Sequence, residues 1–121
     1  MHEMTLIYGI ADIVEKAEKD NGIDHIDSVV VQVGDLSGVI TEFLDEYYPM
    51  FAETIPALTG SELIIEKVPA IGRCRECGTE FDIVKQEGFC PQCGGNQKDV
   101  LSGRDFIIKQ IRVFEETETS Q

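Results

Sequence analysis

The sequence predicts an α+β fold, in which two helices pack on a small three-stranded sheet and a cysteine-bearing module is inserted late in the chain. Three observations predict this arrangement. Apolar residues recur with a period near 3.6 at the start of the chain, three later segments are rich in β-branched residues, and two matching cysteine turns lie between the last two of these segments. At 121 residues, the chain has room for one ordinary domain and one small module.

The first half of the chain contains both expected helices and the first strand. We expect the first helix over residues 4–19. Its apolar stripe contains Ile7, Ile10, Ala11, Val14 and Ala17. Residues 26–33 are expected to form a strand, and the continuous run Val29–Val31 predicts that this strand is buried on both faces. A second helix is expected to begin with Thr41 as its N-cap, and Pro49 predicts that this helix is short or kinked.

The second half is predicted to hold two strands that flank the module. Residues 63–68 and 106–114 are rich in Ile and Val, as strands are. Because both segments adjoin the module in sequence, we expect them to pair as a hairpin that carries the module at its far end. The main domain would then consist of residues 1–69 and 104–121, and the module of residues 70–103.

All four cysteines of the chain lie in this module, in two copies of the unit C-x2-C-G. In each copy a tight turn brings two sulfurs within reach of one metal ion, and the glycine permits the left-handed backbone that the turn requires. Two such turns that face each other form the tetrahedral four-sulfur site that zinc prefers. We therefore predict a zinc-ribbon-like module in which one Zn(II) ion is bound by Cys74, Cys77, Cys90 and Cys93, with iron binding and redox chemistry as the alternatives.

A closed four-thiolate site leaves no coordination position for water or substrate, so the expected role of zinc is structural. The module has few large apolar residues, namely Phe81, Ile83, Val84 and Phe89. Zinc would therefore supply much of its folding free energy, about 10 kcal/mol or more in small zinc modules. The start of the chain does not resemble a signal peptide, and no apolar run reaches the length of a membrane span. We therefore expect a cytoplasmic protein with reduced thiols and no membrane contact.

The charge balance restricts the possible partners. The chain has 23 acidic and 10 basic residues, a net charge of −13. Binding to phosphates requires clustered Lys and Arg, so we expect no nucleic-acid partner, whereas basic proteins and metal cations suit an acidic surface. With the four cysteines assigned to zinc and only two histidines present, no nucleophile and base arrangement remains, and we expect that the protein is not an enzyme.

The first three residues, Met1-His2-Glu3, place several metal ligands next to one another. The α-amine, the His2 backbone nitrogen and the His2 imidazole can close chelate rings on one cation, and planar nitrogen donors suit Ni(II) or Cu(II). Glu3 adds a carboxylate. Taken alone, however, the motif favours the simpler interpretation that His2 is an exposed residue at a chain end. His25, between Asp24 and Ile26, is expected to be an ordinary exposed residue.

Motifs spread over the whole chain occur in an order that is typical of one protein family. They are the Met-His-Glu start, Gly34-Asp35-Leu36-Ser37-Gly38-Val39, Glu62-Leu63, Pro69-Ala70 before Gly72-Arg73-Cys74, Cys90-Pro91-Gln92-Cys93-Gly94, and Ser102-Gly103-Arg104. Together they resemble the hydrogenase nickel-insertion accessory proteins of the HypA/HybF family. The cysteine pairs are common to many zinc ribbons, whereas their combination with the Met-His-Glu start and the two Ser-Gly loops is specific to this family.

The resemblance implies a nickel metallochaperone that binds Ni(II) as transient cargo through Met1, His2 and Glu3. It implies delivery of the ion during maturation of [NiFe]-hydrogenase, and in some organisms of urease. The implied partners are a nickel-handling GTPase and the hydrogenase large subunit, and the protein would be a monomer or a homodimer. The main domain would be the nickel-binding domain, and zinc would be structural.

Two positions depart from the family pattern. Many relatives have an acidic residue where this chain has Ile40, and Glu42 or Asp35 are the candidates to replace it. Some relatives have a histidine in the zinc loop, where this chain has Asn96-Gln97-Lys98. The fourth nickel ligand is therefore left open. The alternative function is that of a zinc-ribbon module for protein interaction or transcription, without a role in nickel handling.

Overall fold

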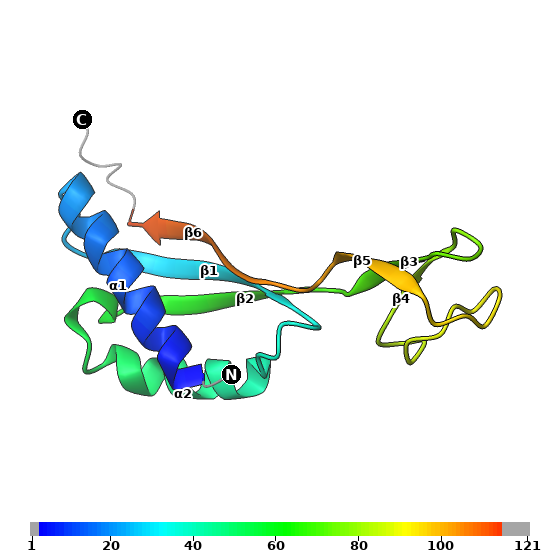
Figure 1. Cartoon of the computed structure of the whole chain (residues 1–121). Coiled ribbons are helices and arrows are strands. Elements are labelled where there is room, and N and C mark those ends of the chain that lie inside the picture. The colour runs from blue at the N-terminus through cyan, green and yellow to red at the C-terminus, as the bar shows by residue number, and fades with distance from the viewer. Residues whose placement is uncertain (1–2, 115–121) are drawn as a thin grey trace. The chain divides into compact units, whose positions relative to one another are not determined.

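The computed structural model describes residues 3–114, so Met1, His2 and residues 115–121 lie outside the described residues. Two helices and six strands form its regular structure, which confirms the predicted α+β class (Figure 1). In chain order the elements are α1 (Glu3–Asn21), β1 (Ile26–Gly34), α2 (Thr41–Ala52), the short 3-10 helix η1 (Pro56–Leu58), β2 (Glu62–Val68), β3 (Ile71–Cys74), β4 (Glu80–Asp82), β5 (Lys98–Ser102) and β6 (Phe106–Val113).

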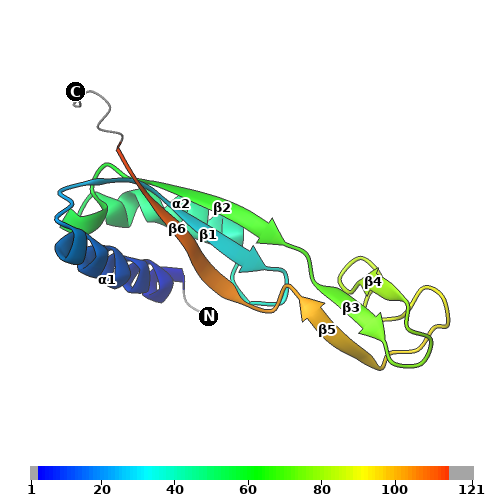
Figure 2. The ribbon, with the colours of Figure 1, turned by 90° about the horizontal axis from the view of Figure 1, so that it is seen from above.

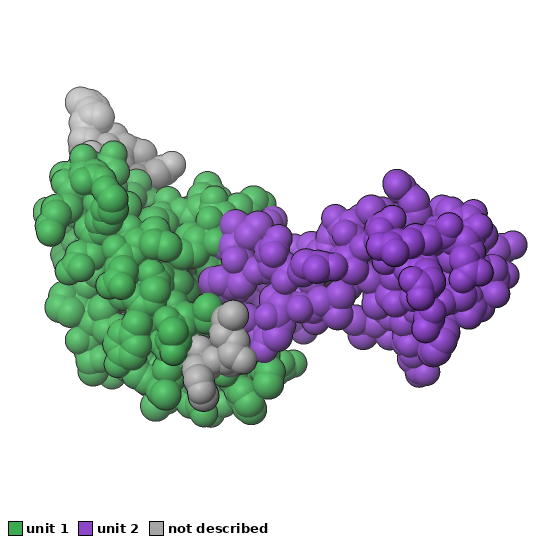
Figure 3. All heavy atoms as spheres, in the orientation of Figure 1, with its two compact units in different colours: residues 1–31, 40–65, 108–121 green, residues 32–39, 66–107 purple. Residues whose placement is uncertain are grey.

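The chain divides into two compact units (Figure 3). The helical unit consists of the described parts of residues 1–31, 40–65 and 108–121. The cysteine unit consists of residues 32–39 and 66–107, and thus contains all four cysteines. The division into functional domains at residues 69/70 and 103/104 stays a prediction.

The core of the helical unit follows the apolar pattern of its sequence. Helix α1 buries Ile7, Ile10, Ala11 and Val14, four of the five residues of the predicted stripe, and Ala17 is half-buried. Helix α2 buries Leu44, Tyr48 and Ala52, which recur at helical spacing. The centre of β1 is inaccessible to solvent at Val29, Val30 and Val31, so the prediction that this strand is buried on both faces is confirmed. Within residues 3–114, no helix is both long and apolar enough to cross a bilayer.

Helix α2 differs from the prediction at its N-terminal end. Its N-cap is Ile40 and not Thr41, because the amides of Phe43 and Leu44 both donate to the Ile40 carbonyl oxygen, each at 3.1 Å. The prediction of a Thr41 cap was therefore wrong. The helix also continues past Pro49 to Ala52. Proline removes one backbone hydrogen bond near the end of the helix, and the burial of Tyr48 and Ala52 on either side of it stabilises the last turn.

The main sheet has the strand order β2-β1-β6 (Figure 2). The strands that flank the cysteine module, β2 and β6, each pair with β1 and not with one another, so the predicted hairpin was wrong. The physical reason is that β1 carries the most continuous apolar sequence and therefore takes the central position, where both of its edges are covered. The strands at the two edges are more exposed than β1.

A second sheet, of order β4-β3-β5, lies in the cysteine unit and was not predicted. Strand β3 pairs antiparallel with both neighbours, and Gly72 lies opposite Phe81 on one side and Val100 on the other. These strands are only three to five residues long, and charged residues and cysteines interrupt their apolar pattern. Sequence periodicity therefore gave too weak a signal to predict them.

Candidate metal centre

The two C-x2-C-G units fold into two equivalent turns. In the first, the Gly78 amide donates to the Cys74 carbonyl oxygen at 2.9 Å, and in the second the Gly94 amide donates to the Cys90 carbonyl oxygen at 2.8 Å. The two glycines have φ angles of +81° and +79°, a backbone conformation that favours glycine. The sequence-based argument for a glycine at this point of each turn is thus confirmed.

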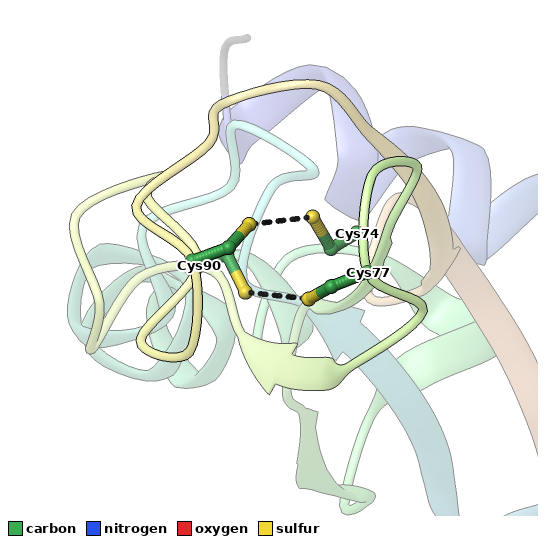
Figure 4. Close-up of side chains that lie close together, drawn as sticks. Cys74, Cys77 and Cys90 are labelled. Atoms are coloured by element: carbon green, nitrogen blue, oxygen red, sulfur yellow. Dashed lines mark hydrogen bonds between the residues drawn. The ribbon is translucent and has the colours of Figure 1, made fainter.

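The turns bring the four sulfurs together. Cys74 Sγ lies 3.5 Å from Cys93 Sγ, and Cys77 Sγ lies 3.5 Å from Cys90 Sγ (Figure 4). All four sulfurs lie within 4.8 Å of one another. A tetrahedral zinc ion with Zn–S bonds of about 2.3 Å requires S–S separations of about 3.8 Å. The donor set therefore fits one zinc ion held by one sulfur from each of the four cysteines, and none of the four forms a disulfide.

Backbone amides stabilise the sulfurs in each turn. The Glu76 amide donates to Cys74 Sγ and the Gln92 amide donates to Cys90 Sγ, both at 3.4 Å. These are the first cysteines of the two units, and they are also the two buried ones, only 2% and 3% exposed. The backbone of each turn thus provides a hydrogen-bond donor to the sulfur that solvent cannot reach.

The thiols influence one another strongly. The hydroxyl and the backbone amide of Thr79, beside Cys77 Sγ, lower the pKa of the Cys77 thiol to about 6. For Cys93, the Gly95 amide favours the thiolate, but Cys74 and the other neighbouring thiols together with burial outweigh it and raise the pKa to about 12. Four sulfurs at these distances repel one another when all are ionised, and a bound divalent cation removes that penalty. The chemistry of the donor set is that of a metal site.

The core beneath this site is small, as the sequence predicts. It consists of Ala70, Cys74, Phe81, Ile83 and Cys90, with Val100 packed against it. Two of these five buried residues belong to the four-cysteine cluster, whereas Val84 and Phe89 are more than half exposed. So small an apolar cluster contributes little hydrophobic stabilisation, and metal binding is the main source of stability available to it.

Three segments of the cysteine unit meet at a close backbone contact, which we term the three-segment crossing. It contains residues 34–36, 68–70 and 102–105. The amides of Gly34, Asp35 and Leu36 donate in turn to the carbonyl oxygens of Asp105, Val68 and Gly103, at 2.9, 3.0 and 2.7 Å. The Ser102 hydroxyl donates to the Pro69 carbonyl oxygen at 2.9 Å. The two Ser-Gly loops of the sequence therefore lie against each other, a contact that sequence reasoning missed.

The residues expected to bind nickel lie only partly within the described chain. Met1 and His2 lie outside it, and Glu3 is the first residue of α1. Glu3 Oε2 accepts a hydrogen bond from the Ile40 amide at 3.2 Å. Ile40, where many relatives have an acidic residue, therefore contacts Glu3 through its backbone amide. Since this bond involves no side chain of Ile40, no sequence signal could have revealed it.

The other residues considered for metal binding have their own surroundings. The Thr41 hydroxyl donates to Glu42 Oε1 at 3.3 Å, and Asp35 belongs to the three-segment crossing. Lys98 lies opposite Cys74 in the pairing of β5 with β3, and its ammonium group donates to the Asn96 carbonyl oxygen at 3.1 Å. His25 is exposed, as expected. Within residues 3–114, the four cysteines are the only group of three or more potential ligands close enough to hold one ion.

Comparison with known proteins connects this fold and site to one family. Residues 1–113 match the family model described as "Hydrogenase/urease nickel incorporation, metallochaperone, hypA". The hydrogenase maturation factor HypA of Geotalea uraniireducens is 34% identical over 113 residues, which cover 93% of this chain and 99% of the relative. The HypA protein of Streptomyces avermitilis is 36% identical over 114 residues, which cover 92% of this chain and 86% of the relative.

Solved structures show the same fold. The solution structure of the Ni metallochaperone HypA from Helicobacter pylori superposes with a TM-score of 0.64 at 20% identity, covering 93% of this chain and 97% of that one. Another solution structure of a HypA protein gives a TM-score of 0.67. The match of the family model to nearly the whole chain, the identity to curated relatives and the four-cysteine site agree: the chain belongs to the HypA family of hydrogenase/urease nickel-incorporation metallochaperones.

Proposed function

We propose that this chain binds Ni(II) through Met1, His2 and Glu3 and delivers it during maturation of [NiFe]-hydrogenase. The observation that carries the proposal is the match of the family model over residues 1–113, which includes all three residues. In chemical terms, His2 supplies imidazole and backbone nitrogens, Met1 supplies its amine, and Glu3 supplies oxygen.

The surroundings of Glu3 support its part in this site. Its Oε2 atom accepts the Ile40 amide, which orients the carboxylate. A carboxylate has a second oxygen and about four lone-pair positions in all, so this hydrogen bond leaves acceptor capacity for a cation. Glu3 also lies in the first turn of α1, where the helix dipole stabilises a negative charge. A partly exposed carboxylate in a fixed orientation suits an ion that must enter and leave.

The zinc site is proposed to have a different role. Its four thiolates complete the coordination of one ion, so the site holds zinc permanently and stabilises the cysteine unit. Delivery requires release, which an incomplete set of nitrogen and oxygen ligands permits and a closed cage does not. We therefore assign cargo transfer to the N-terminal ligands and structural stabilisation to Cys74, Cys77, Cys90 and Cys93.

The partners proposed for this chain are a nickel-handling GTPase and the hydrogenase large subunit, and the proposed location is the cytoplasm. The proposed role is delivery and not catalysis, which is consistent with membership of a metallochaperone family. A zinc-ribbon function in transcription is not favoured, because the family match extends over the helical unit as well as the cysteine unit.

The test is calorimetric titration of untagged, zinc-loaded protein with Ni(II). The chain has only two histidines, so His2→Ala and His25→Ala form a matched pair of variants. We expect one equivalent of Ni(II) to bind to the wild type and to His25→Ala, and we expect His2→Ala to lose this binding while it retains zinc and helix content. Glu3→Gln should weaken binding less, since it removes one oxygen ligand and keeps the nitrogens.

A short extension before Met1 provides a second test, because it converts the α-amine of Met1 into a peptide amide that no longer lies at the chain end. We expect this extension to weaken Ni(II) binding as His2→Ala does. Nickel binding that persists at full strength in both proteins would refute the assignment to Met1 and His2. Nickel binding that appears only after zinc is removed would assign the ion to the cysteines.

A further inference from the structure

An open groove lies between the first turn of α1 and one face of α2. It has a volume of about 420 Å³ and is lined by Glu3, Met4, Phe43, Tyr47, Met50 and Phe51, which we term the helix groove. This volume lies within the range of roughly 300–1,000 Å³ that is typical of binding pockets, so the groove can hold several side chains. All of its lining residues belong to the helical unit.

The groove exposes large apolar side chains that the core leaves uncovered. Met4 is 47% exposed, Phe43 44% and Met50 58%. Aromatic contacts hold several of the lining side chains in place. The ring centroids of Phe43 and Tyr47 lie 6.2 Å apart, and the Phe51 ring packs edge-on against the Tyr8 ring at 5.7 Å. Contiguous exposed apolar residues of this size mark interaction surfaces, and methionine adapts to partners of different shape.

The edge of the helix groove is acidic. Glu3 lies within it, and Glu46 lies between Phe43 and Met50 on the surface of α2, at spacings of three and four residues. Helix α2 contains three acidic residues and no basic one, and the whole sequence between Lys19 and Lys67 contains no Lys or Arg. An apolar floor with a rim of one charge sign selects a partner that is both apolar and of the opposite charge.

From this geometry we propose that the helix groove is the docking site for a cationic amphipathic helix of a partner protein. Such a helix would place its apolar face on Met4, Phe43 and Met50 and its Lys or Arg residues against the acidic rim. Charge repulsion disfavours the other occupants. A second copy carries the same net charge of −13, residues 115–121 contain three glutamates and no basic residue, and an anionic lipid surface would be repelled as well. This inference does not require nickel to bind at Met1 and His2.

The probe for this proposal is a synthetic helical peptide of leucine and lysine, with a twin in which glutamate replaces lysine. The chain contains three methionines, two of which line the groove, so protein labelled with carbon-13 at the methionine methyl groups reports binding directly. We expect the lysine peptide to shift the methyl signals of Met4 and Met50, and the glutamate peptide to leave them unchanged. Met50→Leu assigns the signals.

Affinity is then measured by fluorescence anisotropy of the labelled lysine peptide with full-length, zinc-loaded variants. Phe43→Ser and Met50→Ser should each weaken binding by about tenfold, as expected for central apolar contacts. Ile13→Ser is the matched control, because Ile13 is 49% exposed on α1 and does not line the groove. Glu46→Lys should weaken binding more than Glu62→Lys, which makes the same change of charge away from the groove.

Each other outcome overturns the proposal. If Ile13→Ser lowers the affinity for the lysine peptide as much as the groove variants do, the groove is not the binding site. If both peptides bind equally, charge does not select the ligand. Sedimentation that reveals a concentration-dependent dimer of the wild type, abolished in Phe43→Ser, would make a second copy the occupant. Nickel titration of the same variants separates the two hypotheses, since we expect Phe43→Ser and Met50→Ser to bind Ni(II) as the wild type does.

Discussion

Replacing Gly103 by alanine should destabilise the cysteine unit through both backbone strain and overlap with neighbouring backbone. Gly103 lies in the three-segment crossing at a φ of +85°. A Cβ atom built on it would lie 2.5 Å from Ala70 Cα, 2.6 Å from the Pro69 carbonyl oxygen and 2.7 Å from the Ala70 nitrogen. All three are backbone atoms, so no side-chain rotation relieves the overlap. Carbon atoms pack at about 3.5–4.0 Å, so the segments must separate by about 1 Å.

The cost has two parts that the chain allows us to separate. An alanine in the left-handed region costs about 1–2 kcal/mol, and overpacking costs about 1–3 kcal/mol more. We therefore expect Gly103→Ala to lower the free energy of unfolding by about 2–5 kcal/mol. Gly38 has the same φ of +85° with nothing within 4 Å, so Gly38→Ala should show the backbone cost alone. Gly34 does not have a positive φ but its Cβ would overlap the Gly103 carbonyl, so Gly34→Ala should show the packing cost alone.

Urea unfolding of the zinc-loaded proteins, followed by far-ultraviolet circular dichroism, measures the three losses under one set of conditions. The free energy of unfolding should fall more for Gly103→Ala than for Gly38→Ala, whose added methyl group meets no neighbour within 4 Å. If Gly103→Ala and Gly38→Ala lower the free energy of unfolding equally, the three-segment crossing accommodates the added methyl group at no energetic cost. The argument from close packing would then be refuted. Zinc content, measured on the same samples, excludes metal loss as the cause.

Three further outcomes follow from other parts of the molecule. Zinc removal by a chelator, or Cys74→Ser, should remove the amide-exchange protection of residues 70–103 and leave the protection of α1 and α2, and hydrogen exchange with mass spectrometry measures both. Gly9→Ala should raise the free energy of unfolding by about 0.5–1 kcal/mol in thermal unfolding, because Gly9 lies inside α1 with nothing within 4 Å of a Cβ. Burial raises the pKa of Tyr48, whose hydroxyl bonds Ser61 Oγ at 2.7 Å. Neutral Tyr48 therefore contributes its full share of the folding stability at any pH below the pKa of an unfolded tyrosine. This contribution is lost as the pH rises through the higher pKa of Tyr48 in the folded protein. In an alkaline absorbance titration, Tyr48→Phe should abolish a late-ionising phase.

Local patterns predicted the elements whose sequence signal is strong. The apolar stripe of α1 and the Val29–Val31 run predicted a helix and a buried strand because each depends on neighbours in sequence. The short strands β3, β4 and β5 were not predicted because they depend on pairing with one another and have no distinctive apolar pattern of their own. The N-cap at Ile40 was missed because no side-chain hydrogen bond marks it.

The candidate sites divide in the same way. The spacing of the cysteines was sufficient to predict that their four sulfurs cluster, since each C-x2-C turn is a local structure and the sequence has only one partner turn. The three proposed nickel ligands come from the resemblance of the chain to its family, and Met1 and His2 lie outside the described residues. The contact of Glu3 with the Ile40 amide depends on two residues 37 positions apart in sequence, so only the folded chain shows it.

Residue types at particular spacings along the chain were enough to predict the fold class, the four-sulfur cluster and the family. Three other features could be seen only in the folded chain: β1 and not a hairpin forms the centre of the sheet, the two Ser-Gly loops cross, and Met4 and Met50 share one groove. All three arise from contacts between distant segments. Such contacts are selected by the total burial and hydrogen bonding of the folded chain, to which no single segment contributes a distinctive sequence pattern.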